Sequence, residues 1–255
     1  MNSVASRSLT LTLLSCLFGN FVFAQQFDLL PDIQPSPFRV KATLLTSGLP
    51  VENEMVTEVF TQRVGPTDMT IIPNGTGDVI VSAYGGTAHR IDASGNRADD
   101  LFLDLRDTGS PLSPTASSAF EVGGAHGFTS ITFHPDFGEV ESPGYGKFYT
   151  IESEEVGAGT PDFVNSALTG RHHDDAVYEY TLSDPLLPTC DQACADSKRE
   201  VLRVLQPGWH HNLADLLFDG DGNLFIASGD GSTSRTFAPF MSDNSQQLDL
   251  SLIHI

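Results

Sequence analysis

Basic side chains are scarce in this chain of 255 residues, which has 13 Lys and Arg against 33 Asp and Glu. The formal net charge of −20 repels phosphate groups, so nucleic acids and anionic membrane surfaces are not expected partners. A long hydrophobic run is missing as well. The apolar run near the N-terminus has about 15 residues, short of the ~20 that a membrane-spanning helix needs, so we expect no membrane span.

The first residues have the layout of an export signal. Arg7 is the one charged residue among the first 27, and the apolar run over 9–23 ends in Val22-Phe23-Ala24. This layout predicts a signal peptide over 1–24 and a secreted or periplasmic protein. Leu13-Leu14-Ser15-Cys16 offers the alternative of a lipoprotein cleaved before Cys16. The apolar run continues past Cys16 to a good cleavage site, which favours the signal peptide.

Cysteine is also scarce. The chain has 3, and once the signal peptide is removed only Cys190 and Cys194 remain. An even number of cysteines in an exported chain indicates a disulfide. The C-x-x-x-C spacing would also suit half of a zinc site, but there is no second cysteine pair. Four histidines show no matching ligand spacing: His172, His173, His210 and His211. We therefore expect Cys190 and Cys194 to close a small disulfide loop.

Helical periodicity is nearly absent, whereas short apolar runs separated by Gly, Pro, Asn and Asp recur. The runs form three related pairs, each made of a strand, a tight turn and a second strand. Four strands per repeat are the plan of a β-propeller blade, so the sequence predicts an all-β propeller whose repeats start at 67, 129 and 214. The expected strands lie within 69–84, 89–92, 101–105, 130–151, 176–180, 201–205 and 215–228.

The predicted propeller is incomplete. The third repeat has two clear strands, so 56–249 hold roughly two and a half blades, whereas a closed propeller has about four to eight. We expect 25–55 to be an N-terminal extension and the natural protein to continue beyond this chain. Residues 250–255 break the preceding pattern, and they are what the adaptor end of transposase-based library preparation encodes. We interpret them as a non-native tail, with an ordinary apolar C-terminus as the alternative.

Five segments carry motifs in a fixed order. They are Pro66-Thr67-Asp68-Met69, HGFTSITFHPDF at 126–137, REVLR at 199–203, His211-Asn212 with LFDGDGNLFIASGDG at 217–231, and NSQQL at 244–248. In this order they resemble motifs of the soluble quinoprotein glucose and aldose sugar dehydrogenases, which are six-bladed β-propellers. The likeness covers 60–249, and its specific part is the combination of F-H-P-D-F with the later H-N and G-D.

His211 is the candidate catalytic base. Imidazole ordinarily titrates near pH 6.5 and is the usual base for taking a hydroxyl proton at neutral pH. His211 lies in a polar loop before a buried strand, and Asp230 ends the next strand, where a carboxylate can hold the second imidazole nitrogen. The resemblance implies these roles, with His211 as the base and Asp230 as its partner. From the residues alone, a solvated loop histidine and a Gly-Asp-Gly turn remain the alternatives.

Other polar groups are expected to be structural. We interpret His210 as a loop residue, His134 as part of a strand-end turn, and His172-His173-Asp174-Asp175 as a strand entry rather than a metal site. Asp219-x-Asp221-x-Asn223 mimics a calcium loop, but Leu224 stands where the sharp turn of such a loop needs Gly. A hairpin turn is therefore expected there.

The resemblance implies an oxidoreductase that oxidises an aldose or related sugar by hydride transfer to pyrroloquinoline quinone (PQQ), with Ca²⁺ holding the cofactor. The family's PQQ and Ca²⁺ ligands lie in later blades, so we expect none in this chain and expect the chain by itself to be inactive. Leu213-Ala214 in place of Gly-Gly, and Ala125 in place of a sugar-contacting Gln, leave the sugar open. The alternatives are a non-catalytic propeller binding module, like the Hedgehog-interacting proteins of animals, and a propeller lactonase.

Overall fold

The structure is a computed structural model that describes residues 45–47, 49, 65–106, 114–123, 126–164, 172–208, 210–229, 231 and the backbone of 253–254. The predicted signal peptide lies outside these residues, as does most of the predicted extension over 25–55. All described residues belong to one unit, Thr43–Ile255. Among them, no helix combines the length and the apolar character needed to cross a membrane.

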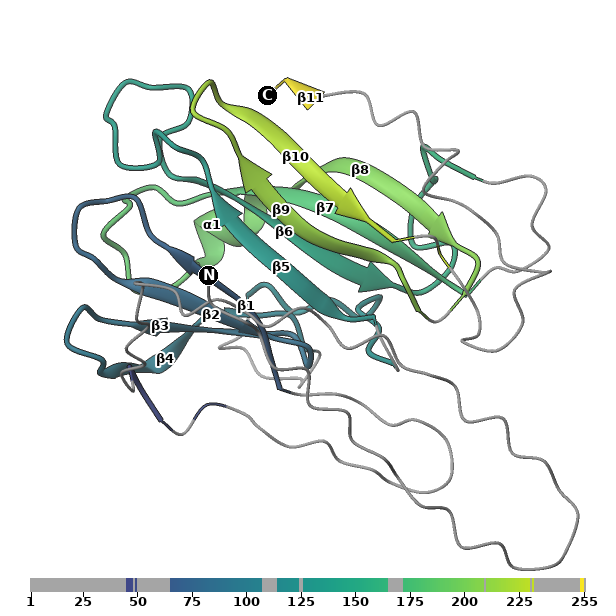
Figure 1. The fold of residues 1–255 in the computed structure, drawn as a ribbon, viewed down its shortest axis with the longest axis horizontal. Helices are drawn as coiled ribbons and strands as arrows, with labels where there is room; N and C mark the ends of the chain where they lie inside the picture. Colours follow the sequence, from purple (N-terminus) through teal and green to yellow (C-terminus); the bar gives the residue numbers. More distant parts are fainter. Residues whose placement is uncertain are drawn as a thin grey trace, which may run out of the picture. The chain divides into compact units, whose positions relative to one another are not determined.

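The described chain forms antiparallel strands in the predicted repeats (Figure 1). The strands are β1 (Pro66–Ile71), β2 (Val79–Ala83), β3 (Thr87–Ile91), β4 (Arg97–Asp104), β5 (Phe128–Phe133), β6 (Lys147–Glu154), β7 (His173–Thr181), β8 (Arg199–Gln206), β9 (Leu213–Phe218), β10 (Asn223–Ser228) and β11 (Ile253–His254). Two four-stranded sheets run in the order β1-β2-β3-β4 and β5-β6-β7-β8. Each of these is a meander of the kind that builds a propeller blade. The prediction of an all-β fold with the plan of an incomplete propeller is confirmed.

The third sheet contains β9, β10 and β11. Its β9–β10 hairpin turns at Gly222, whose φ of 83° lies in the left-handed region that glycine adopts without strain. The two carboxylate oxygens of Asp219 accept hydrogen bonds from the turn itself, from the backbone of Asp221 and from the backbone and side chain of Asn223. This segment is the predicted hairpin turn. Of the predicted tail over 250–255, the structure describes the backbone of Ile253–His254, which pairs with Asn223 and Leu224.

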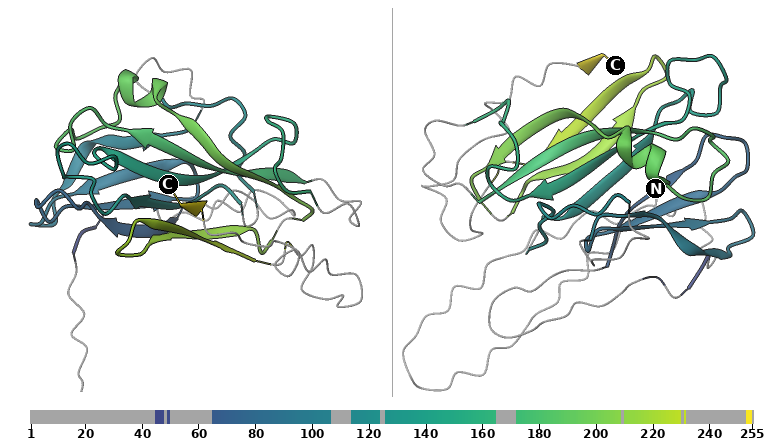
Figure 2. Two further views of the ribbon diagram at one scale, coloured as in Figure 1. Left: turned by 90° about the horizontal axis from the view of Figure 1, so that it is seen from above. Right: turned by 180° about the vertical axis from the view of Figure 1, so that it is seen from behind.

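Successive sheets lie face to face in the ribbon (Figure 2). Two apolar clusters of buried side chains fill the space between them. The first joins the β1–β4 sheet to the β5–β8 sheet, and the second joins the β5–β8 sheet to β9 and β10. Because strand side chains alternate between the two faces, β7 serves both clusters. Its Tyr178 and Tyr180 belong to the first cluster and Val177 to the second. A buried side chain of this size contributes about 1.5–3 kcal/mol, so these faces hold the repeats together.

Equivalent polar contacts join the first strands of successive sheets, β1 to β5 and β5 to β9. Asp68, Ser130 and Asp215 are the second residues of the three repeats. The carboxylate of Asp68 accepts hydrogen bonds from Ser130 Oγ (2.8 Å) and from the backbone N–H of Ile131 (3.1 Å). One repeat later, Ser130 Oγ accepts from the backbone N–H of Leu216 (3.2 Å). Each repeat therefore binds the next one through the same position, which fixes how the strand starts line up.

A short helix, α1 (Gln192–Asp196), lies in the loop between β7 and β8. The sequence patterns did not predict it, because five residues are too few to show helical periodicity. Asp191 caps the helix by accepting from the backbone N–H of Cys194 (3.0 Å). Cys190 and Cys194 form a disulfide across it (S–S 2.02 Å). The backbone N–H of Cys190 donates to the carbonyl of Phe102 (2.8 Å), so this loop is fastened to β4.

Candidate functional site

The starts of β5, β7 and β9 lie at one edge of the sheets, here called the strand-start edge. In an antiparallel meander the first and third strands run in the same direction, so their starts meet. The pairings of Phe128 with Glu152, Glu154 with Asp174, and His173 with Gln206 show this for β5 to β8. Thr129 Oγ1 donates to the carbonyl of Leu213 (3.2 Å), which places the start of β9 beside that of β5. Five histidines lie at or just before these starts: His126, His172, His173, His210 and His211.

His211 stands exposed in the loop that enters β9, and its backbone is held from both sides. Its φ of 58° is in the left-handed region, which is uncommon for a residue with a side chain and is often found at functional sites. Its carbonyl accepts from the backbone N–H of Gly231 (2.8 Å), and the carbonyl of Asn212 accepts from Gly229 (2.9 Å). A Cβ on Gly229 would come within 2.3 Å of the His211 carbonyl oxygen, so only glycine fits there. The exposed imidazole therefore projects from a backbone clamped to the end of β10.

Asp230, the predicted partner of His211, lies outside the described residues, so its role stays a prediction. Gly229 and Gly231, the residues on either side of that position, are the two that bind the backbone of the His211 loop. His210 is half-buried beside His211.

Asp175 is the buried carboxylate that ties the strand-start edge together. One oxygen accepts from Ser153 Oγ (2.6 Å), and the other accepts from Gln206 Nε2 (2.9 Å) and from the backbone N–H of Leu213 (2.9 Å). Burial alone would raise the pKa of Asp175, but His173 and these hydrogen bonds together lower it below its usual value. Asp175 is therefore an anion at neutral pH that fixes the backbone two residues after His211.

Three of the five histidines form a cluster. The rings of His126 and His173 stack with their centroids 4.1 Å apart, and His172 meets both rings edge-on. The Nδ1 atoms of His172 and His173 are 3.0 Å apart. One ring nitrogen from each of the three lies within 4.8 Å of the others. His126 and His173 are buried, at 2% and 0% exposure.

Carboxylates face the outer nitrogens of two of these rings. His173 Nε2 lies 3.3 Å from Asp175 Oδ1, and His126 Nε2 lies 3.6 Å from Glu121 Oε1. Burial, with a smaller contribution from Glu155, raises the pKa of Glu121. Burial, followed by the neighbouring His173 and His210, lowers the pKa of His172 to about 4. At neutral pH His172 is therefore an uncharged imidazole with a lone pair.

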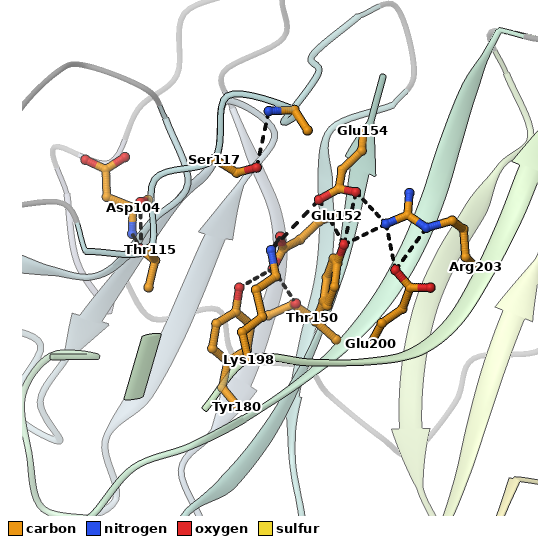
Figure 3. A network of polar contacts seen from close by, with 12 residues as sticks. Asp104, Thr115, Ser117, Thr150, Glu152, Glu154, Tyr180, Lys198, Glu200 and Arg203 are labelled. Carbon is orange, nitrogen blue, oxygen red and sulfur yellow. Dashed lines mark hydrogen bonds and ion pairs between the residues drawn. The ribbon is translucent and has the colours of Figure 1, made fainter. Parts of the chain in front are cut away.

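A second buried polar cluster lies on the opposite face of the β5–β8 sheet (Figure 3). The guanidinium of Arg203 contacts Glu154 (2.6 Å) and Glu200 (2.7 Å), and Lys198 Nζ contacts Glu152 (2.8 Å). The alternation along β7 separates this cluster from the histidines, because His173 and Asp175 point to one face and Asp174 and Tyr178 to the other.

PQQ is a tricarboxylate, so its site needs cations that are available to it. Among the described residues every Lys and Arg has an interaction partner, and the following are paired with Asp or Glu: Arg90, Arg106, Lys147, Lys198, Arg199 and Arg203. The described neighbours of His211 along the chain, His210 and Asn212, have imidazole and amide side chains. The described residues therefore do not fit the quinone, and we assign none of them as its ligand.

No family profile matches the chain. Solved structures similar to it include the soluble aldose sugar dehydrogenase of Escherichia coli in its apo form, at 23% identity over 68% of this chain and a TM-score of 0.43. Two structures of glucose dehydrogenases have 19% identity over 65% of this chain, with TM-scores of 0.43 and 0.42. The chain spans 40%, 38% and 41% of the lengths of these three structures.

The histidine cluster was missed by the sequence patterns. His172 and His173 lie at the entry of β7 as predicted, but they were interpreted there as structural, and His126 was noted only within a motif. The sequence did contain a signal for this cluster. His126 precedes the first strand of the second repeat, and His172 and His173 lie at the start of the third strand of the same repeat. His134 lies in the expected strand-end turn, where its Nδ1 accepts from the backbone N–H of Asp136 (3.1 Å).

Proposed function

We propose that this chain is part of a sugar-oxidising propeller enzyme in which His211 is the general base. The observation that carries the proposal is the exposed imidazole of His211 on a clamped loop at the strand-start edge. The motifs that resemble the quinoprotein sugar dehydrogenases support the same assignment. The substrate is an aldose or a related sugar, and the protein acts after export, in the periplasm or outside the cell.

Oxidation of a sugar hydroxyl to a carbonyl removes a proton from oxygen and a hydride from carbon. A histidine base takes the proton and is most effective when its pKa lies near the working pH. The backbone hydrogen bonds from Gly229 and Gly231 hold the backbone of His211 and Asn212 in place before substrate binds. This lowers the entropic cost of reaching the reactive geometry. Asp175 adds to this rigidity, since it binds the backbone of Leu213 at the end of the same loop.

Asp230 is proposed to hold the second nitrogen of His211. A carboxylate in that position would fix the tautomer that leaves the catalytic nitrogen unprotonated, and it would stabilise the imidazolium once the proton is taken. By the resemblance, PQQ would supply the hydride acceptor and Ca²⁺ would hold the cofactor. We propose that the ligands of both lie outside the described residues.

The test is His211→Gln in a protein that contains this segment together with its quinone-binding part. The glutamine amide cannot take a proton, so the sugar-oxidation rate should fall by about 10²–10⁴-fold while bound quinone, measured by its absorbance, is unchanged. The sugar-oxidation rate should fall less in Asp230→Asn, because this change removes a group that orients His211 and stabilises its charge, and it leaves the proton acceptor in place. His210→Gln is the matched control and should be nearly neutral.

Near-normal turnover of His211→Gln with quinone bound would overturn the assignment of the base. A folded wild-type protein that binds no quinone would overturn the oxidoreductase proposal and favour the non-catalytic binding module. Activity that depended instead on carboxylate-bound metal and hydrolysed a lactone would favour the lactonase.

A further inference from the structure

We infer that His126, His172 and His173 bind one divalent transition-metal ion of the zinc class at the strand-start edge. The site is independent of the proposed base, since neither His211 nor Asp230 belongs to it. It is built by two segments of one sheet, the loop before β5 and the entry of β7 (Figure 1).

The ligand type and number suit this class of metal. Imidazole is a usual ligand for Zn²⁺, Cu²⁺ and Ni²⁺, and three protein ligands leave a fourth position open to water or another ligand. Three imidazole nitrogens are a poor ligand set for Ca²⁺ or Mg²⁺, which take oxygen ligands. The buried position of His126 and His173 also restricts how many water molecules can compete for the ion.

The spacing of the nitrogens is close to what the ion needs. A tetrahedral Zn²⁺ with Zn–N distances of 2.0–2.1 Å holds its nitrogens about 3.3 Å apart. The Nδ1 atoms of His172 and His173 are already 3.0 Å apart, and one ring nitrogen from each of the three histidines lies within 4.8 Å of the others. Closing the widest of these separations to the tetrahedral value takes at most about 1.5 Å.

The outer contacts are those of a metal-binding histidine. Such a residue usually presents its second ring nitrogen to a carboxylate, which sets the tautomer and strengthens the ligand. His173 directs Nδ1 to His172 and Nε2 to Asp175 Oδ1 at 3.3 Å. Asp175 is itself held by Ser153, Gln206 and the backbone of Leu213, so it cannot easily turn away.

Space around the third ligand is also restricted by backbone. A Cβ on Gly123 would lie 2.1 Å from His126 Cε1, so glycine is needed where the chain passes over this ring. The backbone N–H of Gly123 donates to the carbonyl of His126 (3.0 Å), so the backbones of these two residues are bonded to each other. Gly127, directly after it, donates to Ser153 Oγ (2.9 Å), the same hydroxyl that donates to Asp175. Ser153 thus links the loop of His126 to the carboxylate behind His173.

The experiment uses the 255-residue chain without an affinity tag, stripped with EDTA and titrated with Zn²⁺ by calorimetry and with Co²⁺ by visible absorption. Uptake of one ion per chain is expected, and Co²⁺ should show the strong bands of a tetrahedral nitrogen site. His172→Asn and His126→Asn should each weaken binding by more than about 10-fold. Asp175→Asn should weaken it by about 10–100-fold, as carboxylates behind metal-binding histidines do. His210→Asn is the matched control, a neighbouring histidine outside the cluster, and should bind like wild type.

Circular dichroism of each variant checks the fold, and the half-buried His172 gives the variant least disruptive to packing. If folded wild type takes up no Zn²⁺ or Co²⁺, or if His172→Asn binds as tightly as wild type, the inference is wrong. Equal loss in His210→Asn would also overturn it, because the ion would then lie elsewhere on the edge. Since the readout is metal uptake and not sugar oxidation, failure of the proposed enzyme activity would leave this result unaffected.

Discussion

Replacement of Arg203 by methionine would test the buried ion network on the face of the β5–β8 sheet that lies away from the histidines. Arg203 is 1% exposed, and its Nη2 lies 2.6 Å from Glu154 Oε2 (Figure 3). Its Nη1 lies 3.3 Å from Asp174 Oδ2. Methionine fills part of the same space without a charge, so the variant removes the cation and leaves two buried carboxylates in place.

The magnitude follows from the burial of those carboxylates. Removal of one partner of a buried ion pair costs about 3–5 kcal/mol, because the remaining charge loses its compensation. The pair with Glu200 adds less than about 1 kcal/mol, since that carboxylate is partly exposed to water. Lys198 Nζ remains 3.9 Å from Glu154 Oε1 and retains part of the compensation. We therefore expect a loss of about 3–4 kcal/mol in the free energy of unfolding at pH 7.

The loss should shrink in acid. Burial raises the pKa of Asp174, while the Arg203 guanidinium opposes this, so removal of Arg203 raises that pKa further. A carboxyl whose pKa is higher in the folded protein than in the unfolded chain binds more protons when folded. The free energy of unfolding therefore falls as the pH rises through that interval. The difference between wild type and Arg203→Met should be largest at pH 7 and smaller near about pH 4.5.

Urea unfolding at the two pH values measures both effects. Arg106→Met is the matched control, because its ion pair with Asp104 is 47% exposed on the arginine side and should be worth less than about 1 kcal/mol. A loss below about 1 kcal/mol for Arg203→Met at pH 7, or a loss that grows in acid, would show that Arg203 does not compensate these buried carboxylates.

Three further outcomes are expected. Asp68→Ala should lower the free energy of unfolding by about 2 kcal/mol, because the buried backbone N–H of Ile131 loses its acceptor. A double-mutant cycle with Ser130→Ala, measured by urea unfolding, should show a coupling energy of about 1 kcal/mol. Additive losses would contradict the contact between repeats. The Cys190–Cys194 disulfide closes a small loop and removes little entropy from the unfolded chain, so its reduction should cost only about 1–2 kcal/mol. Two free thiols found by mass spectrometry in exported protein would count against the bond. Export should remove residues 1–24, so N-terminal sequencing of the mature protein should begin at Gln25, and a lipid-modified start at Cys16 would contradict this.

Local pattern was sufficient for the strands and their turns. Alternating apolar residues around Asn-Gly and Asp-Gly define hairpins within about ten residues, and no distant contact is needed to find them. The hairpin at Gly222 is an example, because the positive φ of the glycine and the carboxylate of Asp219 are both properties of the turn itself. The four-strand repeat followed from counting such hairpins. Helix α1 was not predicted, because its five residues make about one and a half turns and are too few to show a helical repeat of apolar residues.

The loop that contains His211 could also be predicted from the sequence, since the motif lies between two predicted strands. The backbone conformation of this loop could not be predicted. The positive φ of His211 and the need for glycine at position 229 go together with backbone hydrogen bonds across the hairpin. Which residues pair in these bonds depends on the register of the two strands, and the register cannot be deduced from the sequence.

Residue patterns alone were enough to find the fold class of this protein, the positions of its strands and the loop that carries the candidate base. Which polar groups come into contact depends on how the strands pair and pack. His126 and His173 are far apart in the chain, and they stack because the first and third strands of one antiparallel sheet begin at the same edge. The alternation along β7 then sends His173 and Asp175 to one face and Asp174 to the other. Contacts of this kind depend on register and on which faces pack together, and both are set by the whole set of strands rather than by any one segment.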